Sequence, residues 1–119
     1  MTTVLLVEDD TQTSNLLNIL FDIEGINCVI PQDFLFESIK TLIVNNKPDI
    51  ILMDVNLKQN NEISLLNNFK ENKLLEQNVK IIMTSGSDLR DECIAAGADD
   101  FLLKPYMPDE LLNKVKAHT

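Results

Sequence analysis

Short, uninterrupted runs of apolar residues alternate along the chain with longer segments in which apolar positions recur every three to four residues. The short runs have the length of strands, and the longer segments have the period of a helix. The predicted strands cover residues 3–7, 27–30, 49–53, 80–84 and 99–103. Because these strands are apolar throughout, we expect a parallel sheet that helices cover on both faces.

The segments between the predicted strands each carry an apolar face of helical period. These faces comprise Leu16, Leu17, Leu20 and Phe21; Leu35, Ile39, Leu42 and Ile43; Ile63, Leu66 and Phe69; and Leu111, Leu112 and Val115. Gly25 follows the first helix, Asp88 can cap a short fourth helix that ends at Ala96-Gly97, and Pro108 begins the last. Residues 1–119 therefore form one doubly wound (βα)5 domain of the α/β class, and we expect no output domain.

The charge balance is strongly acidic, with 10 Lys and Arg against 19 Asp and Glu, a net charge of -9 and a pI near 4.4. This balance disfavours direct binding to nucleic acid or to an anionic membrane surface. No leader and no apolar stretch approaching the ~20 residues of a membrane span is present, so we expect a cytoplasmic protein. Cys28 and Cys93 lie in no metal-ligand spacing, and we expect reduced thiols in or near the core.

Polar residues that could take part in a reaction follow four of the predicted strands. Glu8 and Asp9 follow the first, Asp54 the third, Thr84 and Ser85 the fourth, and Lys104 the fifth. Since the carboxyl ends of parallel strands meet at one edge, these side chains are expected to share a site.

Three carboxylates at this edge would repel one another, each close pair by roughly 3 to 4 kcal/mol at ~4 to 5 Å and an effective dielectric near 20. A divalent cation removes that repulsion, and Mg²⁺ is the natural candidate, with Mn²⁺ as an alternative, because it prefers oxygen ligands. Asp54 beside such a cation and near the Lys104 ammonium is placed to attack a phosphoryl group. A hydroxyl at the neighbouring strand end could then bond the phosphoryl group only in the modified state.

Residues 4–10, 52–57, 83–86 and 97–106 carry a resemblance to the receiver domains of two-component response regulators, the CheY-like superfamily. The resemblance runs from end to end and implies a flavodoxin-like fold of strand order 2-1-3-4-5. It also implies that Asp54 is the phosphoacceptor, that Asp9, Asp54 and the carbonyl of Asn56 bind Mg²⁺, and that Glu8 binds mainly through water. Lys104 would contact the phosphoryl group.

The same resemblance implies a cis peptide bond between Lys104 and Pro105. It places Phe101 at an aromatic switch position, where the ring turns inward and alters the face formed by the fourth helix, fifth strand and fifth helix. Plain core packing is an equal alternative for this ring. An ungapped count from Asp54 favours Thr84 as the switch hydroxyl, whereas the small residue that follows favours Ser85, which we choose.

The chain departs from the family pattern in the loop after Asp54, where Lys58 and Glu62 replace the usual proline and glycine. If position 62 needs a positive φ, its glutamate costs on the order of 1 kcal/mol, and the Asn56 ligand depends on this loop. The segment from Ser85 to Lys104 is also shorter than usual, which predicts a trimmed fourth helix.

The resemblance implies a phosphoacceptor signalling module rather than an enzyme with a separate substrate. A sensor histidine kinase or phosphotransfer protein would supply the phosphoryl group, and a downstream protein or output domain would bind the altered face. The alternatives are a pseudo-receiver that is never phosphorylated, a metal-dependent phosphatase with an aspartyl-phosphate intermediate, and a flavodoxin-like cofactor binder. Asn56 opposes the phosphatase, which needs an acid there. Asp10 is expected to cap the first helix, and His118 to be exposed without a partner.

Overall fold

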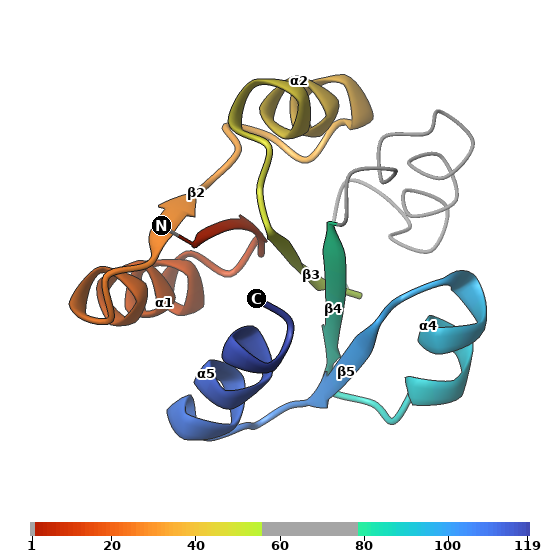
Figure 1. Ribbon diagram of the computed structural model, residues 1–119. Coiled ribbons are helices and arrows are strands. Elements are labelled where there is room, and N and C mark those ends of the chain that lie inside the picture. The colour runs from red at the N-terminus through yellow and green to blue at the C-terminus, as the bar shows by residue number, and fades with distance from the viewer. Residues whose placement is uncertain (1, 56–78) are drawn as a thin grey trace.

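The computed structural model describes residues 2–55 and 79–119 and shows five parallel strands (Figure 1). The strands are β1 (Thr3–Val7), β2 (Asn27–Val29), β3 (Ile50–Asp54), β4 (Lys80–Ser85) and β5 (Asp100–Leu103). Their order in the sheet is β2-β1-β3-β4-β5. This order confirms the predicted flavodoxin-like α/β fold, and each predicted strand differs from the observed one by at most one residue at an end.

Four helices surround the sheet in the described part of the chain: α1 (Thr11–Ile23), α2 (Phe36–Asn46), α4 (Arg90–Ala96) and α5 (Pro108–Ala117). The left-handed backbone of Gly97 ends α4, and Pro108 is the first residue of α5, as predicted. The seven-residue α4 confirms the short fourth helix, although its N-cap residue is Leu89 rather than the predicted Asp88. The third predicted helix, with Ile63, Leu66 and Phe69, lies outside the described residues, as do Lys58 and Glu62.

Alternating side chains of each strand enter two separate cores, one on each face of the sheet. On the face that we call the α2/α4 core, the sheet packs against Ile39 and Ile43 of α2 and Cys93 of α4. On the opposite face, the α1/α5 core, it packs against α1 and α5 through Leu17, Phe21, Leu111 and Val115. Both faces of the sheet are therefore covered, as the continuous apolar strands predicted.

Two predicted core positions are wrong. Leu16 is 68% exposed, because the buried side of α1 runs through Ser14, Leu17 and Phe21 and leaves Leu16 on its flank. Leu35 is 54% exposed, because it is the extended N-cap residue before α2 rather than a member of the helix. Cys28 is half-buried and Cys93 buried, and both are reduced thiols, as expected. No helix in the described ranges is long and apolar enough to cross a bilayer.

Candidate functional site

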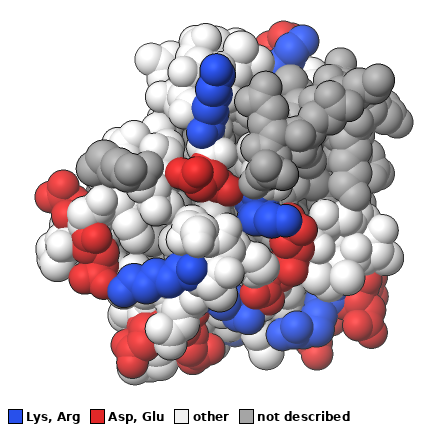
Figure 2. Space-filling view, in the orientation of Figure 1, with Lys and Arg blue, Asp and Glu red and all other residues white. Residues whose placement is uncertain are grey.

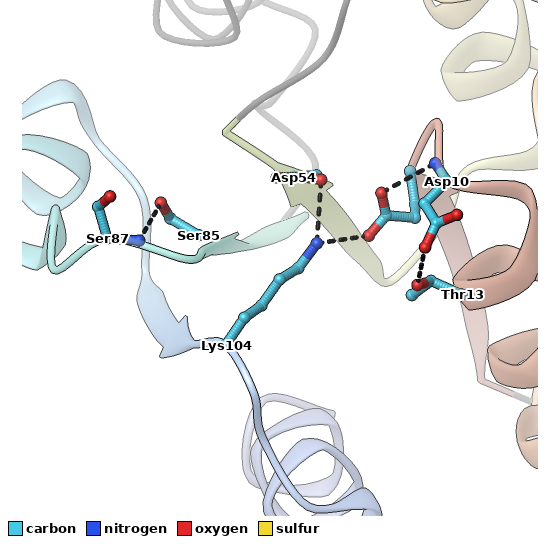
Figure 3. A network of polar contacts seen from close by, with 7 residues as sticks. Asp10, Thr13, Asp54, Ser85, Ser87 and Lys104 are labelled. Carbon is cyan, nitrogen blue, oxygen red and sulfur yellow. Dashed lines mark hydrogen bonds and ion pairs between the residues drawn. The ribbon is translucent and has the colours of Figure 1, made fainter.

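The carboxyl ends of four strands place Glu8, Asp54, Ser85 and Lys104 at one edge of the sheet (Figure 3). Val7 is level with Met53, so Glu8, which follows β1, comes level with Asp54 at the end of β3. Ser85 is level with Leu103, so Lys104 follows at the end of β5. The parallel register thus brings together four residues that are far apart in the sequence.

Three carboxylates form a cluster at this edge. Oxygen atoms of Glu8, Asp9 and Asp54 all lie within 4.8 Å of one another. Glu8 and Asp54 are 5% and 6% exposed, so water screens their charges poorly. Oxygen donors without histidine or cysteine suit a hard divalent cation such as Mg²⁺, and these three residues are the ones that would hold it. Asn56, the predicted carbonyl ligand, lies outside the described residues.

The Lys104 ammonium group lies between two of these acids. Its Nζ atom donates to Glu8 Oε1 at 2.8 Å and to Asp54 Oδ2 at 3.0 Å (Figure 3). The backbone of Lys104 is held as well, since its N–H donates to the Ser85 carbonyl oxygen at 2.7 Å. The peptide bond from Lys104 to Pro105 is cis, which confirms that expectation. Lys104 is thus fixed at the strand edge with its charge facing the acids.

The contacts within the site change the proton affinities of its members. Burial raises the pKa of the Glu8 carboxyl, and its hydrogen bond with Asp54 raises it further. Burial alone would lower the pKa of Lys104, but its hydrogen bonds and charge interactions with Glu8 and Asp54 outweigh burial and raise it. Lys104 therefore stays a cation near neutral pH.

The Asp10 carboxylate forms its hydrogen bond at the start of α1 and is not part of the acidic cluster. It is the N-cap residue of that helix, and its carboxylate accepts a hydrogen bond from the Thr13 hydroxyl, which lowers the Asp10 pKa. Its backbone N–H donates to Glu8 Oε2 at 3.2 Å and helps to hold the Glu8 side chain. The predicted position of Asp10 at the helix start is confirmed, although its carboxylate bonds a side chain there.

Ser85 and Thr84 lie on opposite faces of β4. Along this strand Met83 enters the α2/α4 core and Ile82 the α1/α5 core, so strand alternation assigns Ser85 to the face of Met83 and Thr84 to the other. Phe101, level with Met83, belongs to the same α2/α4 core. Ser85 thus shares a face of the sheet with the predicted switch ring, and Thr84 does not.

The β4–α4 loop contacts Ser85, and the first residue of α4 contacts Phe101. The Ser87 backbone N–H donates to Ser85 Oγ at 3.0 Å, and these two residues lie to one side of Lys104 in Figure 3. The Phe101 ring is 1% exposed, so it lies inside the core. The guanidinium carbon of Arg90, the first residue of α4, is 5.9 Å from the centre of this ring.

The polar cluster around Asp100 was missed by sequence reasoning. Asp100 Oδ1 accepts from Lys114 Nζ at 2.9 Å, and Asp100 Oδ2 lies 3.1 Å from His118 Nε2. The expectation that His118 has no acidic partner is therefore wrong, because the end of α5 lies beside the start of β5. Lys114 and His118 are four residues apart, and this spacing on one helix face was the available signal.

An apolar groove beside Lys104 was also missed. Exposed Leu16, Ile19 and Ile23 of α1 form one wall, and the segment from Lys104 to Pro108 contributes to the other. Its volume is about 650 Å³. The exposed side chains fall at positions i, i+3 and i+7, a helical stripe that leaves one side of α1 without cover.

The fold and the site define a flavodoxin-like α/β domain with an acidic, lysine-containing site at the carboxyl edge of its sheet. The family model of the response regulator receiver domain matches residues 4–116, and the chain belongs to this family. It is 34% identical over 119 residues to the transcriptional regulatory protein CpxR of Klebsiella pneumoniae, covering 98% of this chain and 49% of CpxR. The chain therefore spans about half the length of that relative.

Solved structures agree with this assignment. The receiver domain of a Francisella response regulator superposes with a TM-score of 0.86 at 27% identity, covering 99% of this chain and 96% of that one. A chemotaxis response regulator of Vibrio cholerae reaches the same TM-score at 20% identity, covering 100% and 99%, and shows the fold alone. Receiver domains are signalling modules of two-component systems, and this is the class to which the chain belongs.

Proposed function

We propose that the chain is a phosphoacceptor module of a two-component system or phosphorelay, in which Asp54 receives a phosphoryl group. The observation that carries this proposal is the position of the Asp54 carboxylate. It lies at the end of β3, 3.0 Å from Lys104 Nζ and within 4.8 Å of Glu8 and Asp9. The ammonium attracts an anionic phosphoryl group, and a divalent cation held by the acids would attract it as well, so the Asp54 carboxylate is placed to attack phosphorus.

The donor is a phosphohistidine of a sensor histidine kinase or phosphotransfer protein, or a small phosphodonor. An Asp54 oxygen forms a bond to phosphorus while the bond from phosphorus to the imidazole nitrogen breaks, and that nitrogen keeps the electron pair and takes up a proton. The Lys104 ammonium neutralises charge on the phosphoryl oxygens. Mg²⁺ or Mn²⁺, when bound by Asp9 and Asp54, with Glu8 through water and the Asn56 carbonyl, supplies further neutralisation.

Signal transmission in this proposal depends on Ser85 and Phe101. The Ser85 hydroxyl donates to a phosphoryl oxygen only when Asp54 is modified, so its contact differs between the two states. Their shared sheet face supports Ser85 rather than Thr84 as the partner of Phe101. The position of the ring in turn sets the α4-β5-α5 face, which a downstream protein or an output domain binds.

The groove between α1 and the segment from Lys104 to Pro108 is the proposed docking surface for the phosphodonor. It begins at Lys104, a residue of the phosphoryl site, so a partner seated in it reaches Asp54. Leu16, Ile19 and Ile23 would pack against an apolar helix of that partner. Replacement of Ile19 with Glu should slow transfer from the kinase while leaving transfer from acetyl phosphate unchanged.

We place the module in the cytoplasm. It catalyses no reaction on a separate substrate, and it binds neither membrane nor nucleic acid directly. Figure 2 supports the last point, since Lys and Arg side chains on the visible face are interspersed with Asp and Glu and form no continuous basic patch among the described residues. The net charge of -9 also disfavours binding to nucleic acid.

Amide spectra recorded with magnesium and then with beryllofluoride test the proposal. We expect magnesium to shift signals around Asp9 and Asp54, and beryllofluoride to shift signals in α4 and β5 as well. Asp54→Asn should abolish the beryllofluoride response. A protein that responds to neither addition would be a pseudo-receiver, and steady hydrolysis of an unrelated phosphomonoester would favour the phosphatase.

A further inference from the structure

We infer that Arg90 is a positioning residue for Phe101, holding the aromatic ring in its buried position and linking that position to the start of α4. This inference rests on the proposed function, since it assigns a residue that acts on the proposed switch. The guanidinium carbon lies 5.9 Å from the ring centre, within the range of a cation–π interaction.

The identity of the residue supports a specific role. Arg90 is the only arginine among the 119 residues, whereas lysine supplies the other nine basic side chains. A guanidinium is planar and weakly hydrated, so it stacks on an aromatic face better than an ammonium group does. The single arginine of the chain therefore lies where a planar guanidinium can stack on an aromatic ring.

The position of Arg90 in the helix also supports this role. A cation in the first turn of a helix faces the positive end of the helix dipole, which favours acids such as the neighbouring Asp91 and Glu92. Local helix preference therefore opposes arginine at this position, and a conflict between local preference and sequence is expected where a residue serves another purpose. Contact with the Phe101 ring is that purpose.

The contact joins two ends of one loop. Ser87 N–H bonds Ser85 Oγ at the beginning of the β4–α4 loop, and Arg90 lies over Phe101 at its end. The ring itself packs in the core that contains Cys93 of α4. A movement of Ser85 that shifts the loop also shifts the guanidinium, so Arg90 connects the proposed phosphoryl site to the ring from the α4 side.

Fluorine NMR of protein labelled with 4-fluorophenylalanine, in magnesium alone, tests the inference. The Phe101 signal is assigned with Phe101→Leu among the five phenylalanines of the chain. Arg90→Gln should lower the ratio of buried to outward ring by about two- to fivefold, the size of an exposed cation–π interaction. Arg90→Lys should restore part of the ratio, and Lys40→Gln on α2, with the same charge change, should leave it unchanged.

Beryllofluoride affinity gives a second, independent measurement. If the buried ring favours the modified state, linkage requires that Arg90→Gln weaken beryllofluoride binding by up to the same factor. An unchanged Phe101 signal in Arg90→Gln, or equal effects of Arg90→Gln and Lys40→Gln, would overturn the role of Arg90. A wild-type protein that binds no beryllofluoride would instead overturn the proposed function, while the ring signal in magnesium would still decide the inference.

Discussion

The ammonium nitrogen of Lys104 lies 3.0 Å from Oδ2 of Asp54, although fifty positions of sequence separate the two residues. The same nitrogen lies 2.8 Å from Glu8, so the lysine occupies the side of the acidic cluster that a metal ion would share. In the proposed function Lys104 would have two effects that can be measured separately: it would compete with a bound cation for the acids, and it would prepare Asp54 for an anionic phosphoryl group.

Replacing Lys104 with Met should tighten magnesium binding about fivefold and slow phosphorylation of Asp54 at least about tenfold. The acids lose a competing positive charge, while the phosphoryl oxygens lose a charged donor. Tyr106 is the only tyrosine, and the chain has no tryptophan, so tyrosine fluorescence can follow the magnesium titration. Lys114→Met removes a charge that pairs with Asp100 instead and should leave magnesium affinity unchanged. Equal magnesium affinities of wild type and Lys104→Met would show that no competition exists.

Replacing Ser85 with Ala should abolish the spectral response of α4 to beryllofluoride, whereas Thr84→Val should preserve it. The two residues lie on opposite faces of β4, and only Ser85 shares the face of Phe101. Amide spectra of both variants with magnesium and beryllofluoride make the comparison. Loss of the response in Thr84→Val alone would assign the switch hydroxyl to Thr84.

Phe101→Leu and Phe21→Leu should destabilise the fold by similar amounts, about 1 kcal/mol each, because both rings are fully buried in their cores. Only Phe101→Leu should prevent modification of Asp54 from changing the α4-β5-α5 face. Urea unfolding gives the stability of each variant, and binding of the output partner before and after phosphorylation gives the second quantity. If both variants keep a normal response, Phe101 is plain core, which is the alternative that the sequence left open.

Replacing Asp100 with Asn should lower stability by about 1 kcal/mol at neutral pH. Burial alone would raise the Asp100 pKa, but hydrogen bonds from Lys114, His118 and its neighbouring backbone outweigh burial and lower it below 3.8. A lowered folded-state pKa contributes stability above the unfolded value, and that contribution is lost as the pH falls through the folded value. The difference in unfolding free energy between wild type and Asp100→Asn should therefore shrink below about pH 4.

Asp91→Asn is the control for this measurement, since Asp91 is exposed at the start of α4. The helix dipole gives an exposed acid only a small stabilisation, so Asp91→Asn should change the pH dependence of wild type less than Asp100→Asn does. A stability difference for Asp100→Asn that persists undiminished at low pH would assign the effect to packing rather than to the ionised Asp100 carboxylate that Lys114 and His118 contact.

The sheet and the site edge could be predicted because their signals are local. Apolar runs that stop at Glu8, Asp54 and Lys104 mark strand ends, and parallel strands end at one edge whatever the loops do. The choice between Thr84 and Ser85 was harder, because a shift of one residue moves a side chain to the other face of a sheet. The observed register of β4 and β5 puts Ser85 on the sheet face of Phe101, and its role as the switch hydroxyl stays a prediction.

Features that depend on tertiary contacts could not be predicted from the sequence. Leu16 fits the helical period of α1 yet lines an open groove, because its burial depends on how the helix rotates against the sheet. His118 finds Asp100 only because the end of α5 lies beside the start of β5. The predicted Asn56 ligand lies outside the described residues and stays a prediction.

Intact mass of the protein after incubation with acetyl phosphate and magnesium tests the central claim most directly. Wild-type protein should gain the mass of one phosphoryl group, lose it again on standing, and gain nothing once a chelator removes magnesium. Asp54→Asn should gain no phosphoryl group under any of these conditions, while its amide spectrum shows an intact fold. A wild-type protein that stays unmodified, or an Asp54→Asn variant that is modified to the same extent, would contradict the assignment of Asp54 as phosphoacceptor.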